Sequence, residues 1–252
     1  MSPINILDTC IPSQVIDEEP WVKLANGVDL AEWGREDMIR YNQRNRQYAK
    51  HLFFMSVFDF LKERNVLGDY FEFGCHRVRT FRMALTEARK QMMEDIRFFA
   101  FDSFEGLPEC PADVDVDPWV KGGLCTTEEE FMELIREHVL FVDKVFTFKG
   151  FYKVSLTKAL QQKLLTMDAR ASLITVDCDL IDSARDVFRF VGPFLQPGTV
   201  VYLDDMFGGY QGSPIKGVYK AFQEFMETTE FQFFPYLQVG AFGRSFIAYK
   251  ES

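Results

Sequence analysis

Carboxylate side chains follow four of the apolar segments that this sequence predicts as parallel strands. Because the carboxyl ends of parallel strands meet at one edge of a sheet, we expect these side chains to converge on a single crevice. Any one of them alone could equally be a turn or helix-cap residue, but four strand ends together favour a shared site. They are Glu72, Asp102, the pair Asp177 and Asp179, and the pair Asp204 and Asp205.

Three of these carboxylates are candidate metal ligands. Asp177, Asp204 and Asp205 would offer hard oxygen donors from neighbouring strand ends. Mg²⁺ suits such a set, since it prefers carboxylates and keeps waters that a substrate hydroxyl can displace. A metal-bound alcohol is more acidic, so Asp179 is a candidate to accept its proton. A hydrogen-bonded acidic edge without metal is the alternative.

The stretch at residues 69–80 is typical of the start of a nucleotide-type site. Its apolar strand carries Glu72 near the end and is followed by Gly74, where the backbone can turn tightly and expose its N–H groups. Four residues later, Val78 stands where a second glycine is expected. A β-branched residue resists positive φ, so we expect the turn to differ or to avoid that conformation.

Asp102 follows the second predicted strand. A carboxylate there can accept both hydroxyls of a ribose, which favours a cofactor that contains adenosine. The sequence lacks the G-x-G-x-x-G segment at its first turn, and this counts against NAD. His76 lies in that turn, where contact with a ligand and simple packing both stay open, whereas His51 and His138 fall inside predicted helices and are assigned to packing or the surface.

Alternating strands and helices would position these side chains. Apolar runs predict strands at 69–74, 96–101, 145–149, 172–176 and 199–203, and a closing hairpin of 231–237 with 245–249. Helical patterns are found at 36–65, 80–93, from 128 with Thr126 or Thr127 as cap, 157–165, 183–191 and 214–227. The pattern predicts an α/β fold, namely a Rossmann-like, doubly wound, mostly parallel seven-stranded sheet with a C-terminal antiparallel hairpin and helices on both faces.

Two parts of the chain are expected. Residues 1–65 would form an N-terminal extension and a helical cover, and residues 66–252 the α/β domain. A long loop includes an acidic segment at 109–117. The simplest interpretation is a solvated loop, and the functional alternative is a loop that recognises the substrate or acts as a lid.

Composition argues against several classes of function. The formal charge of −10 has the wrong sign for binding a phosphate backbone, so no nucleic acid partner is expected. Five cysteines, scattered and without a Cys-x-x-Cys pair, fit a reduced cytosol better than a disulfide scaffold or a zinc site. The sequence shows no leader pattern and no apolar run of about 18 residues, so neither secretion nor a membrane span is expected.

Five stretches resemble the macrocin-type O-methyltransferases, a family of class I S-adenosylmethionine-dependent enzymes that act on sugar hydroxyls of antibiotics. The resemblance implies methyl transfer to a small-molecule substrate, a sugar or glycosylated natural product, with Mg²⁺ as a second cofactor. A cytoplasmic location and a homo-oligomer are compatible with it. The stretches, in the family's order, are Gly68–Gly74, Phe101–Pro108, Gly150–Phe151, Val176–Leu180 and Pro197–Asp205.

The resemblance also implies where the cofactor lies. It assigns the methionine end to the first turn, the ribose to the end of the second strand, and the adenine to the residues after the second and third strands. In that order, the implied contacts are Glu72, Gly74, Cys75 and His76, then Asp102, then Ser103, Gly150 and Phe151.

The remaining implied roles concern the metal and the chemistry. Asp177 would contact the cofactor and bind Mg²⁺ together with Asp204 and Asp205. Asp179 would be the candidate base, and Asp177 would share its catalytic role.

Two positions depart from the family's pattern. Residues 76–79 replace its glycine-rich turn with larger side chains, and Ile181 stands where an aromatic residue is common. The altered turn keeps a second hypothesis open, a catalytically altered methyltransferase-like protein that acts as a binding or scaffolding partner. A third is another metal-dependent enzyme on the same fold that acts on a nucleotide.

Overall fold

The computed structural model describes residues 31–109, 121–208 and 212–250. The chain divides into two compact units, residues 1–45 and 46–252. In the first unit, helix α3 (Arg35–Glu63) begins, and the ring of Trp33 packs edge-on against Tyr41 with centroids 5.6 Å apart. The second unit starts within this helix and contains the sheet. The division expected at residue 65 stays a prediction.

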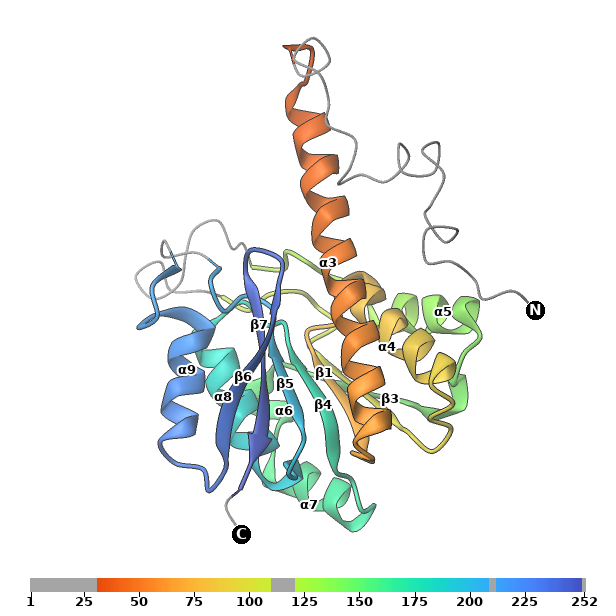
Figure 1. Cartoon of the computed structure of the whole chain (residues 1–252), viewed down its shortest axis with the longest axis vertical. Helices are drawn as coiled ribbons and strands as arrows, with labels where there is room; N and C mark the ends of the chain where they lie inside the picture. Colours follow the sequence, from red (N-terminus) through yellow and green to blue (C-terminus); the bar gives the residue numbers. More distant parts are fainter. Residues whose placement is uncertain (1–30, 110–120, 209–211, 251–252) are drawn as a thin grey trace, which may run out of the picture. The chain divides into compact units, whose positions relative to one another are not determined.

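A seven-stranded sheet forms the centre of the second unit (Figure 1). The spatial order is β3-β2-β1-β4-β5-β7-β6, with β1 to β5 parallel and β7 antiparallel to both β5 and β6. The predicted fold is confirmed. The strands are β1 (Asp69–Phe73), β2 (Phe98–Asp102), β3 (Val145–Lys149), β4 (Ala171–Val176), β5 (Val200–Leu203), β6 (Gln232–Val239) and β7 (Gly243–Tyr249).

Helices cover both faces of the sheet (Figure 1). One apolar core joins the sheet to α7, α8 and α9, and the other joins it to α3, α4 and α5. Besides α3, the helices are α4 (Arg79–Lys90), α5 (Glu128–His138), α6 (Tyr152–Ser155), α7 (Lys158–Thr166), α8 (Ile181–Val191) and α9 (Gly217–Met226), with short 3-10 turns at η2 (His76–Val78), η3 (Val142–Lys144) and η4 (Gly192–Phe194).

Side chains alternate between these two cores along β1. Phe71 and Phe73 pack with the α7–α9 core, and Tyr70 packs with the α3–α5 core. Because a strand has a period of two, Glu72 lies on the same face as Tyr70. This places the Glu72 carboxylate toward α3 and α4.

The strand order reverses between β1 and β4. From this pair the chain runs through β2 to β3 on one side and to β5 on the other. In an open α/β sheet such a reversal leaves a crevice beyond the carboxyl ends of the strands, where ligands bind. The predicted carboxylates follow these ends.

Of the two residues predicted as the cap of α5, Thr127 is confirmed, in a capping box with Glu130. A few other elements differ in detail from their prediction. The last predicted helix begins at Gly217 instead of Pro214, and the short helix α6 was not predicted. Most of the predicted acidic segment at 109–117 lies outside the described residues.

No helix in the described ranges of the chain combines the length and the apolar character that a membrane span requires.

Candidate functional site

Backbone hydrogen bonds continue the sheet past the strand ends. They hold the residue that follows each of β1, β3, β4 and β5 in register with the neighbouring strand. The edge of the sheet is therefore well defined where the predicted side chains stand. The donors are the amides of Gly74, Gly150, Asp177 and Asp204, with N···O distances of 2.9–3.0 Å.

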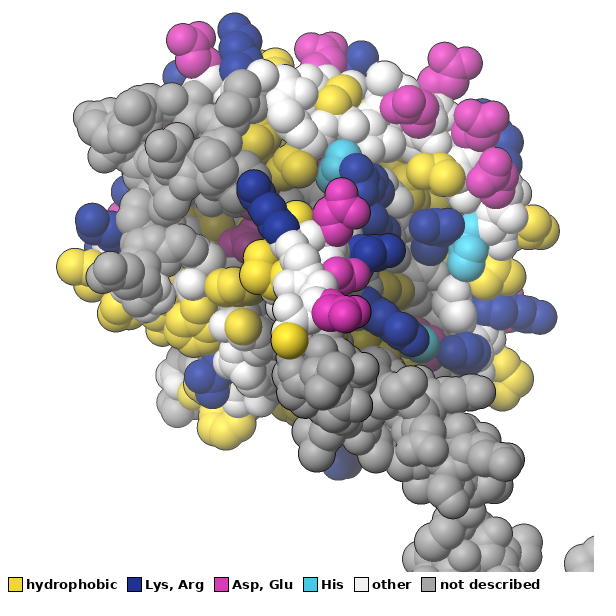
Figure 2. All heavy atoms as spheres, turned by 90° about the horizontal axis from the view of Figure 1, so that it is seen from above, with side chains coloured by type: hydrophobic (Ala, Val, Ile, Leu, Met, Phe, Trp, Pro, Cys, Tyr) yellow, Lys and Arg dark blue, Asp and Glu magenta, His cyan; other side chains and the backbone are white. Residues whose placement is uncertain are grey.

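Figure 2 shows the face of the molecule that lies uppermost in Figure 1, with dark blue Lys and Arg side chains and magenta Asp and Glu side chains interspersed on the part that is drawn in colour.

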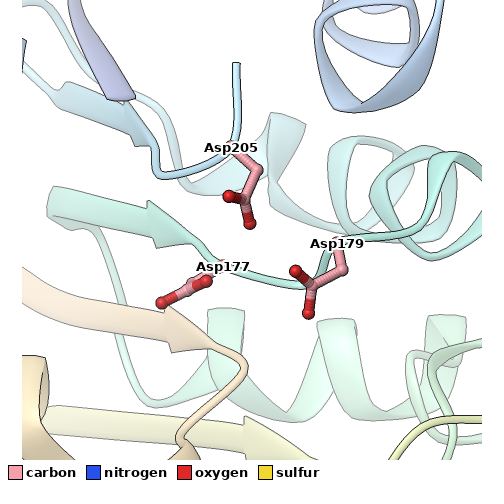
Figure 3. A group of neighbouring side chains, drawn as sticks. All are labelled: Asp177, Asp179 and Asp205. Atoms are coloured by element: carbon pink, nitrogen blue, oxygen red, sulfur yellow. The ribbon is translucent and has the colours of Figure 1, made fainter. Parts of the chain in front are cut away.

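Three aspartates come together at the ends of β4 and β5, and we refer to Asp177, Asp179 and Asp205 as the acidic group. One carboxylate oxygen of each lies within 4.8 Å of the others, and all three residues are partly exposed. Figure 3 shows the side chains of Asp179 and Asp205 turned toward one another, with Asp177 beside them. A shared ligand could therefore contact all three.

Burial, together with neighbouring carboxylates, raises the pKa of every member of the acidic group. Burial raises the pKa of Asp177, and the neighbouring Asp204 adds to it. Burial and the charge of Asp177 raise the pKa of Asp179 to about 7. Burial and Asp204 raise the pKa of Asp205, which also shares a hydrogen bond with Asp179. Because like charges this close oppose joint ionisation, the group is suited to hold either a proton or a cation.

Lys50 of α3 reaches into this edge from the helix. Its Nζ lies 2.7 Å from Oδ2 of Asp204 and 3.5 Å from Oδ2 of Asp177. The side chain is only 16% exposed. Burial lowers the pKa of the Lys50 ammonium, but Asp177 and Asp204 together outweigh this and raise it above its ordinary value.

Two of the three predicted metal ligands, Asp177 and Asp205, belong to the acidic group. Asp204 accepts from Lys50 through Oδ2 and from the Tyr202 hydroxyl through Oδ1. Among the described residues, Asp179 and not Asp204 completes the group with Asp177 and Asp205. Each Asp204 oxygen accepts one hydrogen bond and can accept a second, so the metal-binding role of Asp204 stays a prediction.

Sequence reasoning missed Lys50 because no local motif surrounds it. One signal was present, since Lys50 stands on the same helical face as Phe53, Phe54 and Val57, which are buried. A charged residue on a buried helix face needs a partner. That partner, Asp204, is 154 residues away in the sequence.

Glu72 is enclosed rather than presented at the edge. Its side chain is fully buried and accepts from the Tyr70 hydroxyl and, at 2.7 Å, from Oγ1 of Thr80. Burial raises the pKa of Glu72 to about 7. In this structure the carboxylate ties β1 to the start of α4, and its predicted contact with the methionine end of a cofactor stays a prediction.

Gly74 meets a steric requirement of the turn. Its φ is +91°, and a Cβ at this position would overlap the carbonyl oxygen of Asp177. The turn after β1 thus passes directly against the turn after β4. Only glycine permits this approach.

The expectation that the following residues avoid positive φ is wrong. Arg77 and Val78 both have φ of 57°, and Val78 is left-handed despite its branched Cβ. Thr126 holds this conformation by accepting from the Arg77 amide at 2.9 Å and by bonding Nδ1 of His76 at 3.0 Å. The Val78 side chain is fully buried in the α3–α5 core, so tertiary packing overrides the local preference.

Asp102 is partly exposed at the end of β2 and anchors two turns. Oδ2 accepts from the Cys75 amide at 2.7 Å, and Oδ1 accepts from the Phe104 amide at 2.8 Å. Ser103 is buried, and its hydroxyl donates to the carbonyl of Gly106 at 2.7 Å. Asp102 is therefore accessible to a ligand, whereas the Ser103 hydroxyl is engaged in a hydrogen bond within its own turn.

The other predicted cofactor residues also fall into accessible and buried ones. Gly150, Phe151 and His76 are partly exposed at the strand ends. Cys75 is buried, with its thiol directed at the carbonyls of Glu72 and Phe101. Accessible candidates thus follow β1, β2 and β3, whereas the acidic group follows β4 and β5.

Comparisons with known proteins agree with this geometry. A sequence model of the macrocin-O-methyltransferase (TylF) family matches residues 51–233. No curated protein matches the chain by sequence. Among solved structures, the O-methyltransferase NovP is similar at a TM-score of 0.61 and 20% identity, over 79% of each chain. The calicheamicin methyltransferase CalS11 is similar at a TM-score of 0.63 and 15% identity, over 93% of this chain and 90% of its own. These structural similarities establish the shared fold.

Proposed function

Because the chain belongs to the macrocin-O-methyltransferase family, it is an S-adenosylmethionine-dependent O-methyltransferase, and we propose that Mg²⁺ assists it in methylating a hydroxyl of a sugar or other small natural product. One structure that shares the fold supports this class of acceptor, since CalS11 is a TDP-rhamnose 3′-O-methyltransferase of calicheamicin biosynthesis. The observation that carries the Mg²⁺ proposal is the acidic group, three carboxylates within 4.8 Å at one edge of the crevice.

The residues after β1, β2 and β3 fit the cofactor. Gly74 has no side chain to cover the backbone of the turn, and Asp102 is partly exposed. Oδ2 of Asp102 accepts one backbone hydrogen bond, and a carboxylate oxygen can accept a second, here from a ribose hydroxyl. Gly150 and Phe151 would lie by the adenine. When bound, S-adenosylmethionine supplies the methyl group on a reactive sulfonium.

The acidic group fits Mg²⁺ by the chemistry of its donors. Its carboxylates are hard oxygen ligands and remain partly exposed, and burial together with the charges of neighbouring aspartates raises their pKa values. A divalent cation would offset the repulsion among these charges. When bound, Mg²⁺ makes an acceptor hydroxyl more acidic.

Asp179 is the proposed general base, whereas Asp177, Asp204 and Asp205 are the proposed metal ligands. Without metal, burial and the charge of Asp177 raise the pKa of Asp179 to about 7, which is a suitable range for a base that works near neutral pH. Asp177 is fixed beside it, since its amide donates to the Phe73 carbonyl at 2.9 Å. These side chains would orient the hydroxyl toward the methyl group, and positioning of this kind supplies much of the rate of such a transfer.

Calorimetric titration with S-adenosylmethionine, with and without Mg²⁺, tests the proposal. We expect binding in both cases, and methyl transfer to nucleotide-sugar or glycoside acceptors that falls when EDTA removes the metal. Absence of cofactor binding in a folded sample would refute the proposed function. If EDTA left the rate of methyl transfer unchanged, Mg²⁺ would have no part in the proposed function.

The strained turn at Arg77 and Val78 favours one other function, a catalytically altered protein that acts as a binding or scaffolding partner. That function needs no cofactor, so Asp177→Asn or Asp205→Asn would leave it intact. The titration above separates the two. The expected cytoplasmic location, the absence of a nucleic acid partner and the possible homo-oligomer stay predictions.

A further inference from the structure

The turn after β1 carries basic side chains, and we refer to residues 76–79 as the arginine turn. In it, Arg77 is exposed, and Arg79, the first residue of α4, is partly exposed. Arg82 follows one turn of α4 later on the same helix face, with its Nε directed at the Val78 carbonyl. Guanidinium groups are therefore concentrated at the start of this helix.

These guanidinium groups have no carboxylate partner in the part of the chain that the structure describes. Arg77 is hydrogen-bonded through its backbone amide alone, and neither Arg79 nor Arg82 forms an ion pair there. Other arginines of this acidic chain are paired, as Arg97 is with Asp69 at 2.7 Å. The start of α4 thus keeps an uncompensated positive charge.

The histidine of the arginine turn lies within reach of this charge. Burial and the charges of Arg77 and Arg79 lower the pKa of His76. Asp102 acts in the opposite direction on His76, but its oxygens accept from backbone amides and not from the arginines. The positive charge therefore lies beside the predicted ribose site without being neutralised by it.

The helix itself adds to this charge. The first turn of α4 contains no acidic side chain, and its N-cap residue, Val78, forms no side-chain cap. In α5, by contrast, Thr127 caps the helix and acidic residues occupy the first turn. Because the amino end of a helix is partially positive, arginines there repel it. A bound anion would relieve this repulsion.

The arginine turn is held in place close to the acidic group. Arg77 has φ of 57°, and Thr126 fixes it by accepting from its amide at 2.9 Å. Strained conformations of this kind are concentrated at functional sites. A Cβ on Gly74 would overlap the carbonyl oxygen of Asp177, so the turns after β1 and β4 lie against one another. A ligand at the acidic group therefore has the arginine turn as a neighbour.

S-adenosylmethionine does not supply the missing negative charge. Its sulfonium and its ammonium are positive and it has one carboxylate, so the whole cofactor is positively charged. Mg²⁺ would add more positive charge. The anion must then come from the acceptor.

We propose that the acceptor is a sugar linked to a nucleoside diphosphate, with Arg77 and Arg79 binding its pyrophosphate while the sugar hydroxyl lies at the acidic group. This inference rests on the proposed function and selects the nucleotide sugar over the glycoside. Guanidinium groups bind phosphate oxygens through paired, charge-assisted hydrogen bonds. The product is then consumed by glycosyl transfer, in which the bond from the anomeric carbon to the pyrophosphate oxygen breaks and the nucleoside diphosphate leaves.

Calorimetry on the full chain, with S-adenosylhomocysteine present and no added metal, tests the proposal. The probes are inorganic pyrophosphate, UDP-glucose, dTDP-glucose and methyl glucoside, which has no charge. We expect pyrophosphate and a nucleotide sugar to bind, and methyl glucoside not to bind measurably. Pyrophosphate should bind more weakly as the salt concentration rises, because salt screens exposed charges.

Arginine variants locate the anion. Arg77→Gln and Arg79→Gln should each raise the dissociation constant of pyrophosphate at least about tenfold, as is typical when hydrogen bonds to a charged group are lost. Arg77→Lys should lose less, because it keeps the charge without the planar fork. Arg64→Gln is the matched control, since Arg64 is exposed and precedes β1 at the opposite end of the strand. It removes the same charge and should stay within about threefold of the wild type.

The same variants separate the acceptor from the cofactor. S-adenosylhomocysteine has no net charge, so its dissociation constant should stay within about threefold in Arg77→Gln and Arg79→Gln. If these variants weakened S-adenosylhomocysteine but not 5′-methylthioadenosine, which lacks the amino-acid group, the arginines would bind the cofactor carboxylate. That result would overturn the proposal.

The remaining outcomes are distinct. Binding of S-adenosylhomocysteine without binding of pyrophosphate or a nucleotide sugar would overturn this inference and leave the proposed function standing. Equal losses in Arg77→Gln and Arg64→Gln would also overturn it. Pyrophosphate binding that appears only when Asp113, Asp115 and Asp117 are replaced by Asn would overturn it as well, because the chain's own acidic segment would then supply the anion. Absence of S-adenosylhomocysteine binding in a folded sample would refute the proposed function and this inference with it.

Discussion

Two parts of the carboxyl edge of the sheet are destabilised in different ways. At the ends of β4 and β5 the main cost is electrostatic, with the pKa of Asp179 raised to about 7 and Lys50 as a counter-charge. At the end of β1 the cost lies in the backbone, where Arg77 and the β-branched Val78 adopt φ of 57°; Asp179 has a φ of 58°, but aspartate tolerates the left-handed region better. A bound cation can relieve the electrostatic cost. The left-handed backbone after β1 is held by packing and by Thr126, so a ligand should leave this conformation unchanged.

The largest effect on stability is expected where the turn after β1 contacts the turn after β4. In Gly74→Ala, the new methyl group would overlap the Asp177 carbonyl, at a position where φ is +91°. The strained conformation and the overlap together should lower the free energy of unfolding by about 3–5 kcal/mol. Urea denaturation measures this.

Gly122→Ala is the matched control for that substitution. Gly122 has φ of +75°, but a Cβ there would meet nothing within 4 Å. We expect only the conformational part of the loss, about 1 kcal/mol. Equal losses in the two variants would show that contact between the two turns is not what requires Gly74.

A smaller effect is expected from the pH dependence of Glu72. Its pKa of about 7 in the folded state exceeds the value of about 4.3 in an unfolded chain. Folding is therefore favoured most below the unfolded value, and this contribution is lost as the pH rises through 7. The free energy of unfolding of the wild type should therefore include a decline of about 2–3 kcal/mol between pH 5 and pH 8 that is due to Glu72. This part of the decline should be absent in Glu72→Gln. Urea denaturation at the two pH values gives this difference.

The same measurement in Mg²⁺ sharpens the contrast between the two sides. Asp179 also has a pKa of about 7, so Asp179→Asn should flatten the pH dependence of a metal-free sample. Saturating Mg²⁺ should abolish that difference for Asp179 and reduce it less for Glu72, whose fully buried side chain acts on Asp177 through its charge but is not a member of the acidic group. Equal sensitivity to Mg²⁺ at both positions would contradict the separation of the two sides.

The smallest effect concerns Val78. Glycine normally destabilises a protein more than alanine, but a left-handed position penalises alanine and not glycine. Val78→Gly should therefore be more stable than Val78→Ala by about 0.5–1 kcal/mol. Val57, equally buried but inside α3, is the control, and there the glycine variant should be less stable by about 1 kcal/mol. The same order at both positions would show that the turn carries no strain.

The sheet could be predicted from sequence because its strands are short, apolar and closed by turn residues. The uninterrupted run ending at Val176, for example, is buried on both faces of the sheet. The acidic group could also be placed at one edge, because parallel strands force their ends together.

The rest depends on contacts between distant segments. Lys50 meets Asp204 across 154 residues, a pairing that no local pattern in the sequence indicates. Val78 is left-handed because its side chain is locked into the core and Thr126 fixes the turn before it, which outweighs the preference of a β-branched residue. Glu72 is turned from the crevice by the alternation of β1 and by Tyr70 and Thr80.

The central claim is that the cofactor binds after β1 to β3 and Mg²⁺ after β4 and β5. Calorimetry with S-adenosylhomocysteine and with Mg²⁺ on Asp102→Asn and Asp205→Asn tests it most directly. We expect Asp102→Asn to weaken S-adenosylhomocysteine at least about tenfold, since it loses charge-assisted hydrogen bonds, and to leave Mg²⁺ within about threefold. Asp205→Asn should do the reverse. If Asp205→Asn weakened S-adenosylhomocysteine while leaving Mg²⁺ binding unchanged, the claim would be contradicted.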